Sequence, residues 1–237
     1  MSIRDNLDIS AYLVLGPENT LDRPVPDIVA EAVRAGFTCI QLRSKTASAR
    51  QLISCARETA RVIQDAGASE RVALLVDDRL DIVLACREAG IKVDGVHVGQ
   101  SDIPVDVCRK YVGEQGIVGL SARVDEMLAY VKTADVTDVD YFGVSPLHPT
   151  DTKPDAGLDA HGNMVVKTLD DLATLAAASP LPIVVGGGVK ANDIPALAKT
   201  GVDGFFVVSA VCAAPDPYKA AKQLVDAWAQ HASAASC

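Results

Sequence analysis

Residues 89–98 read AGIKVDGVHV, and this stretch decides the fold. Gly90 follows a helix-like segment, and Val93-Asp94-Gly95-Val96 leads into a short apolar run typical of a buried strand. A Val-Asp pair also precedes two other apolar runs, in Val139-Asp140-Tyr141-Phe142 and in Val202-Asp203-Gly204-Phe205. We interpret the three copies as the junctions of one repeating unit, in which a helix ends and a parallel strand begins.

The same unit extends outward along the whole chain. Helix-like stretches end in a glycine, which closes a helix in the left-handed conformation at little steric cost. These glycines are Gly36, Gly67, Gly90, Gly113 and Gly201. Apolar runs predict eight strands, at residues 12–15, 38–42, 72–76, 95–98, 117–120, 141–144, 182–185 and 205–208. Because an open doubly wound sheet usually has about five or six strands, the sequence predicts a single-domain (β/α)₈ TIM barrel over residues 1–237.

Composition narrows the function classes. The 237 residues are 49% hydrophobic and carry a net charge of −9. Phosphate backbones and anionic lipids repel such a chain, so we expect no nucleic acid and no membrane as partner. The amino-terminal MSIRDNLDIS has no apolar leader, and the six scattered cysteines lack metal or dithiol spacing. We therefore expect a cytoplasmic enzyme with small-molecule substrates, and a homo-oligomer is a prior expectation only.

One segment interrupts the alternation. Residues 145–163, SPLHPTDTKPDAGLDAHGN, are polar and too long for an ordinary βα turn. Loops of this length in compact domains tend to be lids or binding loops, with a disordered insertion as the alternative. Since the segment follows the sixth strand, we expect it to lie over the active-site face.

In a barrel of this kind the residues just after each strand converge on one face, where active sites are built. The predicted strand ends carry cations, carboxylates, hydroxyls and a glycine turn, a combination that suits a phosphate ester and a metal. These residues are 41–45, 77–79, 99–102, Ser121, 150–153, 186–188 and Ser209.

Two pairs of charged residues indicate how an anion is held. Arg43 and Lys45 lie two apart and can clamp a diphosphate from one side of a strand end, although a solvated basic pair is the alternative. Asp78 and Asp102 offer oxygen donors suited to Mg²⁺, although each also precedes a predicted helix and can be its N-cap.

The remaining polar positions carry weaker predictions. Gly186 to Gly188 allow backbone N–H groups to approach a phosphate beside Ser209, or form a tight turn. His97 lies inside an apolar strand and is interpreted as structural, with a satisfied hydrogen bond. His148 and His161 have no metal-ligand neighbours in the sequence and are interpreted as solvated.

These motifs, taken in order, resemble the thiamine phosphate synthase family. The resemblance runs from Tyr12 to about Val225. It rests on residues 41–45 (QLRSK), 77–79 (DDR), 95–100 (GVHVGQ), 149–153 (PTDTK), 187–188 (GG) and 208–209 (VS). It implies that Mg²⁺ assists the departure of diphosphate from a pyrimidine substrate, and that thiazole phosphate captures the resulting carbocation.

The resemblance also implies residue roles. Arg43, Lys45, Ser121 and Lys153 would be catalytic, and Asp78 with Asp102 would bind Mg²⁺. Gln41, Arg43, Lys45 and Lys153 would hold the pyrimidine diphosphate, and Ser121 would lie beside the pyrimidine. The residues that would receive the thiazole phosphate are Thr150, Thr152, Gly188, Val208 and Ser209. The matching motifs add Leu42, Ser44, Asp77 and Asp151 to the candidate substrate-binding residues.

One departure from the family pattern changes a charge, and three alternative functions remain. Asp77 stands where the family usually has Asn, so a metal, a neighbouring cation or a protonated carboxyl must relieve its charge beside the diphosphate. A thiazole tautomerase-like barrel needs no diphosphate-binding residues. A non-catalytic phosphate-ligand sensor, or another phosphate-binding barrel enzyme such as a sugar-phosphate epimerase, is also compatible with the glycine turn.

Overall fold

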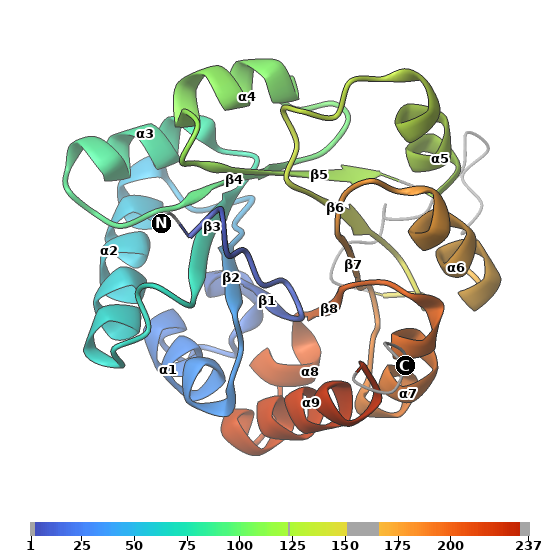
Figure 1. Cartoon of the computed structure of the whole chain (residues 1–237). Coiled ribbons are helices and arrows are strands. Elements are labelled where there is room, and N and C mark those ends of the chain that lie inside the picture. The colour runs from blue at the N-terminus through green and yellow to red at the C-terminus, as the bar shows by residue number, and fades with distance from the viewer. Residues whose placement is uncertain (1–2, 123, 151–165, 233–237) are drawn as a thin grey trace.

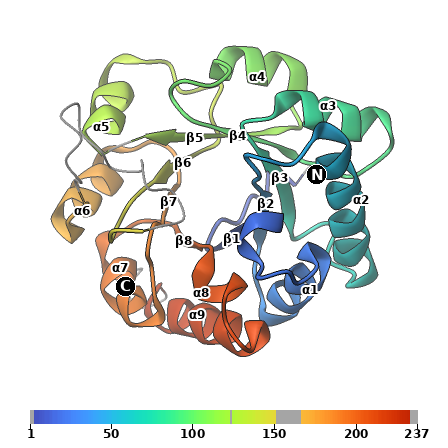
Figure 2. The same cartoon turned by 180° about the vertical axis from the view of Figure 1, so that it is seen from behind.

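The chain folds as a closed barrel of parallel strands surrounded by helices (Figures 1 and 2). The structure is a computed structural model that describes residues 3–122, 124–150 and 166–232. The strands pair in sequence order from β1 to β8, and β8 closes on β1. The predicted (β/α)₈ barrel is therefore confirmed.

Each strand boundary lies within two residues of its prediction. The strands are β1 (Ala11–Leu15), β2 (Cys39–Leu42), β3 (Ala73–Asp77), β4 (Gly95–Val98), β5 (Ile117–Ala122), β6 (Tyr141–Val144), β7 (Ile183–Val185) and β8 (Gly204–Val207). The helices are α1 (Val25–Ala35), α2 (Ala49–Asp65), α3 (Leu80–Glu88), α4 (Val105–Val112), α5 (Val124–Thr133), α6 (Leu169–Ala178), α7 (Ile194–Leu197), α8 (Ser209–Cys212) and α9 (Pro217–Ala232). Short 3₁₀ helices occupy η1 (Pro17–Asn19), η2 (Ala191–Asp193) and η3 (Ala198–Thr200).

The glycines predicted to end helices all have a positive φ, as expected for that role: Gly36, Gly67, Gly90, Gly113 and Gly201. Gly36 shows why the residue is needed. At φ 111° its N–H donates to the carbonyls of Ala32 and Val33, which closes α1 and turns the chain into β2.

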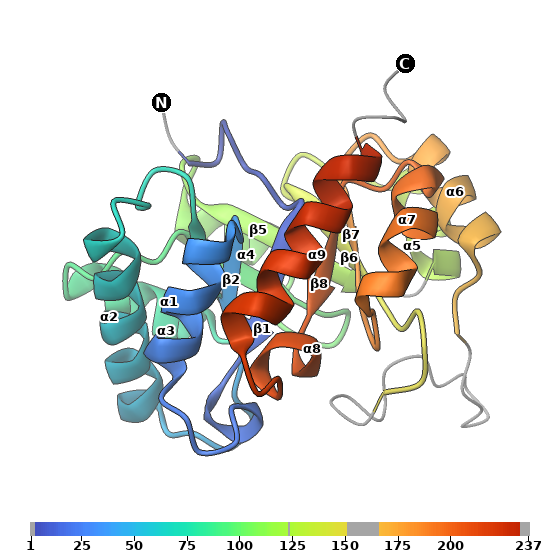
Figure 3. The same ribbon diagram turned by 90° about the horizontal axis from the view of Figure 1, so that it is seen from below.

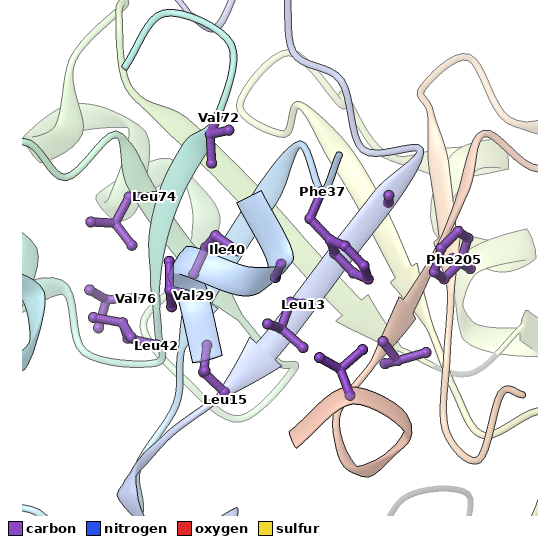
Figure 4. Close-up of a cluster of buried hydrophobic side chains, with 14 of the residues drawn as sticks. Leu13, Leu15, Val29, Phe37, Ile40, Leu42, Val72, Leu74, Val76 and Phe205 are labelled. Atoms are coloured by element: carbon purple, nitrogen blue, oxygen red, sulfur yellow. The ribbon is translucent and has the colours of Figure 1, made fainter. Parts of the chain in front are cut away.

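Alternation along each strand separates two cores. In β1, Leu13 and Leu15 point outward and pack against the helices, together with side chains such as Val29 and Phe37 (Figure 4). Tyr12 and Val14 point inward and belong to a second cluster that fills the barrel. Because successive side chains of a strand face opposite ways, a residue's position in the strand decides which core it joins.

The repeated Val-Asp lead has a structural role at the amino-terminal end of the barrel. The carboxylates of Asp94, Asp140 and Asp203 accept hydrogen bonds from the backbone N–H groups of Leu74, Val118 and Ile183, at 2.7, 2.7 and 2.8 Å. Each aspartate therefore ties the strand that it precedes to the strand before it. The three ties fall on β4, β6 and β8, so the repeat closes alternate strand pairs.

The parallel direction of the strands decides where the site lies. The carboxyl ends of all eight strands open on one face of the barrel, because the strands are parallel. In Figure 3 this is the face at which α8 follows β8. Among the helices in the described residues, none is long and apolar enough to cross a membrane.

Candidate active site

A cavity of about 620 Å³ opens at the carboxyl ends of the strands, and every strand contributes to its lining. Among the residues predicted from the sequence, the lining includes Gln41, Arg43, Asp77, Asp78, Ser121, Thr150, Gly188, Val208 and Ser209. Residues from strands far apart in the sequence thus meet around one space, as the barrel topology requires.

Other predicted residues lie elsewhere. Leu42 has its side chain in the outer core, because Gln41 takes the inward position of β2. Ser44 faces Glu18 rather than the cavity, and donates its hydroxyl hydrogen to that carboxylate. Asp151, Thr152 and Lys153 lie outside the described residues, as do His161 and most of the long loop.

Arg43 and Asp77 form an ion pair at the cavity wall. The Nε atom of Arg43 lies 3.0 Å from Oδ2 of Asp77, and both side chains are largely buried. A neighbouring cation therefore relieves the charge of the unusual aspartate, which was one of the three expected solutions. The pairing also holds the guanidinium at the cavity, since Arg43 and Asp77 both line it.

Lys45 reaches the same region from the exposed side and pairs with Asp78. Burial opposes ionisation of Asp78, but the hydrogen bonds and charge of Lys45 outweigh it, so the pKa of Asp78 is lowered. The backbone of Asp78 is left-handed at φ 59°, a conformation that Asp tolerates better than most residues. This turn directs the chain from β3 into α3.

Asp102 lies close enough to Asp78 for the two carboxyl groups to shift each other's pKa. Burial raises the pKa of Asp102 and the negative charge of Asp78 adds to the effect, while the N–H of Gly99 donates to Asp102 Oδ2 at 2.8 Å. Neither aspartate caps a helix, because Arg79 and Pro104 are the N-cap residues of α3 and α4. The helix-capping alternative is therefore excluded.

Glu18 belongs to the site region but was not predicted from the sequence. It lies in η1, after β1, and its carboxylate accepts hydrogen bonds from Ser44 Oγ and from both the N–H and the hydroxyl of Thr46. These contacts fix the loop that carries Arg43 and Lys45. No local signal reveals the contact, because the partners are separated by 26 and 28 positions.

The floor of the cavity is a connected set of polar side chains. His97 lines the cavity and bonds Tyr141 through Nδ1 and Ser121 through Nε2, so the predicted hydrogen bonding of this histidine is confirmed. Tyr141 continues to Tyr12, which accepts a hydrogen bond from Gln41. The two tyrosines were not predicted, although their inward positions in β1 and β6 would have been a usable signal.

The glycine turn after β7 lies opposite the ion pairs. Gly187 and Gly188 have φ values of 79° and 73°, so the tight turn is present. A side chain on Gly188 would press on His148, and one on Gly186 would overlap the ring of Phe206. Close packing as well as backbone conformation therefore requires glycine here.

His148 differs from its prediction as a solvated residue. Its ring is half-exposed, but Nε2 lies 2.9 Å from Oδ1 of Asp193 in η2. The partner is 45 positions away, so local spacing did not reveal it. Together the two residues join the loop after β6 to the loop after β7.

The described cysteines form no disulfide and have no place in the cavity lining. Burial raises the pKa of the Cys212 thiol to about 12 and that of Cys55 to about 11. Cys39, Cys86, Cys108 and Cys212 are buried and Cys55 is partly buried, in agreement with their interpretation as buried or spectator thiols. Cys237 lies outside the described residues.

Comparison with known proteins places this geometry in a family. The family model described as thiamine monophosphate synthase matches residues 11–211. The thiamine-phosphate synthase of Natronomonas pharaonis is 36% identical over 220 residues, covering 93% of this chain and 95% of the relative. That of Corynebacterium efficiens is 36% identical over 229 residues, covering 96% and 99%.

A solved structure agrees with the sequence comparison. The thiamine phosphate pyrophosphorylase from Pyrococcus furiosus superposes with a TM-score of 0.75 and 28% identity, covering 96% of this chain and 98% of that one. The match thus extends over nearly the whole length of both chains. The chain belongs to the thiamine monophosphate synthase family.

Proposed function

We propose that this chain condenses 4-amino-2-methyl-5-(diphosphooxymethyl)pyrimidine with thiazole phosphate to give thiamine phosphate and diphosphate. The proposal is supported by one observation: a single cavity is lined by two separate groups of residues that can bind phosphate. Arg43 with its neighbouring carboxylates forms one wall, and the Gly187-Gly188 turn with Ser209 forms the other. Two phosphorylated substrates can therefore bind facing each other across one floor.

The first wall suits the diphosphate. Arg43 and Lys45 supply positive charge, and Lys153 is predicted to join them from the loop after β6. Removal of diphosphate from a pyrimidine methylene needs no nucleophilic residue, only stabilisation of the leaving charge, so cations at this wall can carry much of the catalysis. The carbocation left behind would be captured by the thiazole nitrogen.

Asp78 and Asp102 fit a Mg²⁺ ion. Two carboxyl groups in contact repel each other when both are ionised, and the raised pKa of Asp102 reflects its burial and that repulsion. A divalent cation removes the conflict, and Mg²⁺ typically takes one or two carboxylates together with phosphate oxygens and water. When bound, it would supply charge neutralisation for the departing diphosphate.

The second wall suits the thiazole phosphate. Within the described residues, the backbone N–H groups of Gly187 and Gly188 have no recorded hydrogen-bond partner. They border the cavity beside Val208 and Ser209, where a phosphate can accept hydrogen bonds from backbone and hydroxyl. Thr150 lines the same cavity, and Thr152 is predicted to act with it.

The test is condensation of the two substrates with and without Mg²⁺, following thiamine phosphate and diphosphate release. We expect Mg²⁺-dependent product that is lost in Asp102→Ala. A folded protein that binds thiazole phosphate without forming product would instead support the tautomerase or sensor alternatives.

The dissociative step is tested separately by ¹⁸O in the bridging position of the pyrimidine diphosphate. If the bond breaks before thiazole phosphate attacks, the label scrambles into non-bridging positions when the second substrate is replaced by an unreactive analogue. If the label does not scramble although the enzyme binds both the pyrimidine diphosphate and the analogue, the dissociative step is contradicted. The overall condensation reaction is not affected by that result.

A further inference from the structure

A continuous chain of hydrogen bonds crosses the barrel beneath the cavity. Gln41 Nε2 lies 2.6 Å from the Tyr12 hydroxyl, which lies 2.8 Å from the Tyr141 hydroxyl. Tyr141 lies 2.7 Å from His97 Nδ1, and His97 Nε2 lies 2.9 Å from Ser121 Oγ. The chain begins and ends at cavity-lining residues for which the family resemblance implies contact with the pyrimidine.

Two glycines make room for the middle of this chain. A methyl group on Gly119 would overlap both the Tyr141 ring and His97 Nδ1, and one on Gly143 would press on the His97 ring and on Ser121 Oγ. Gly119 lies in β5, next to the strand of His97, and Gly143 lies one strand further on, in β6. The absence of side chains on these two glycines therefore allows Tyr141, His97 and Ser121 to approach within hydrogen-bond distance.

The hydrogen positions follow in one direction from Gln41. The Tyr12 hydroxyl accepts from the Gln41 amide, and its own hydrogen can go to Tyr141 or to the Cys39 thiol, which also lies against it. Because a thiol is a weak acceptor, we assign this hydrogen to Tyr141. Tyr141 in turn donates to Nδ1 of His97. A neutral imidazole that accepts at Nδ1 carries its hydrogen on Nε2, which then donates to Ser121.

The two ends of this chain of hydrogen bonds, Ser121 and Gln41, then differ in hydrogen-bonding character. Ser121 Oγ accepts from His97, so its own hydrogen is left to donate into the cavity. Gln41 uses an amide hydrogen on Tyr12, which leaves its carbonyl oxygen as an acceptor. An aminopyrimidine presents the matching pair, because its ring nitrogens accept hydrogen bonds and its exocyclic amino group donates them.

We propose that Tyr12, Tyr141 and His97 are positioning residues that fix Ser121 as a hydrogen-bond donor and Gln41 as an acceptor toward an aminopyrimidine. The inference rests on the proposed function for the identity of the ligand, but the orientation of the chain is a property of the protein alone. Burial raises the pKa of both tyrosines well above the ordinary value, so their hydroxyl groups keep their hydrogens in the working pH range.

The first measurement is the tautomer of His97 in the intact protein without substrate. Two-bond ¹H–¹⁵N correlations of ¹⁵N-histidine distinguish the Nε2–H form from the Nδ1–H form, and the signal is assigned through its bonds to the backbone of residue 97. We expect Nε2–H. An Nδ1–H tautomer means that the chain runs in the opposite direction, and it overturns the proposal.

The second measurement compares Tyr141→Phe with Tyr130→Phe, which makes the same chemical change in α5, outside the barrel interior. We expect Tyr141→Phe to raise the KM for the pyrimidine diphosphate about tenfold, as expected for a misdirected buried hydrogen bond, with the KM for thiazole phosphate nearly unchanged. It should also mix the His97 tautomers. The Tyr130 variant should match the parent.

The outcomes separate the two proposals. Equal changes in both KM values, or a parent-like tautomer in Tyr141→Phe, would show a merely structural role and reject the inference. If Tyr141→Phe does not fold, the tautomer of the parent protein still decides the orientation. If the parent protein has the Nε2–H tautomer but no condensation activity, the proposed function is wrong. The inferred direction of the hydrogen bonds from Gln41 to Ser121 then still holds.

Discussion

The two ends of the barrel use aspartate in opposite ways. At the amino-terminal end, Asp94, Asp140 and Asp203 each accept a backbone hydrogen bond from a neighbouring strand, and the ion pairs of Asp94 and Asp140 are added to these bonds. At the carboxyl end, Asp77 and Asp78 pair with the cations Arg43 and Lys45. The first set satisfies backbone groups permanently, whereas the second gathers charges that a substrate or metal ion can rearrange.

Whether an aspartate has a structural or a functional role therefore depends on its partners and not on its residue type. A carboxylate that accepts hydrogen bonds from backbone N–H groups keeps those partners when a ligand binds, so it contributes to the stability of the fold. Asp78 and Asp102 are in contact and compete for positive charge, so they gain from a ligand. The following changes test that division, in order of decreasing effect.

Asp78→Asn should abolish most activity while leaving the fold intact. Asn tolerates the left-handed backbone at this position, and the substitution removes the repulsion with Asp102. We expect kcat/KM to fall by on the order of 100-fold or more, because a charge that holds the proposed Mg²⁺ is lost. Thermal unfolding should be unchanged or slightly higher.

Asp81→Asn is the matched control, since Asp81 makes the same type of ion pair with Arg79 three positions further along the chain, in α3. Its kcat/KM should equal that of the parent. Equal losses in the two variants would mean that Asp78 acts through general surface charge, not through the site.

Asp140→Asn should have the reverse profile, with lower stability and unchanged activity per folded molecule. Asp140 is largely buried and binds Arg4 and Arg109 at 2.7 and 2.6 Å, besides the Val118 N–H. Breaking a buried ion pair by removing one partner costs about 3 kcal/mol. Urea unfolding measures the loss, and Asp138→Asn, whose backbone rather than side chain contacts Arg109, serves as the control.

Glu18→Gln should weaken the site without disrupting the barrel. It loosens the loop that carries Arg43 and Lys45, so we expect the KM for the pyrimidine diphosphate to rise about threefold, in line with the loss of one net hydrogen bond. An unchanged KM with intact turnover would show that the loop keeps its shape without this carboxylate.

The pH dependence of stability provides a second test of Glu18. Burial works to raise the pKa of Glu18, but hydrogen bonds from Ser44 and Thr46 outweigh it, so the pKa is lowered. A lowered pKa in the folded protein adds stability above the ordinary value, and the gain is lost as the pH falls. The stability difference between parent and Glu18→Gln should therefore shrink below about pH 4.5.

Arg79→Ala should have the smallest effect. The pair between Arg79 and Asp81 is exposed, with side-chain exposures of 38% and 63%. Exposed pairs contribute about 0.5 kcal/mol or less, so both activity and urea midpoint should stay near the parent values. A large loss of activity would show that Arg79 belongs to the functional set of charges at this end of the barrel.

Much of the candidate site was predictable because it lies on strand ends. Gln41, Arg43, Asp78 and Ser121 follow or end short apolar runs, and the parallel topology carries all such positions to one face. Contacts between loops were not predictable in this way. Glu18 with Thr46, and His148 with Asp193, are distant in sequence, and side chains on loops have no periodicity that reveals their partners.

The sequence by itself determined the barrel, since alternating apolar runs, helix-ending glycines and the Val-Asp repeat are local signals of backbone conformation and burial. It also identified many of the residues that line the cavity at the carboxyl ends of the strands. Only the tertiary structure decided which of these residues are partners: Arg43 with Asp77, and His97 between Tyr141 and Ser121. The physical reason is that hydrogen bonds and ion pairs depend on separations of a few ångströms across the barrel, which barrel closure sets and chain order does not encode.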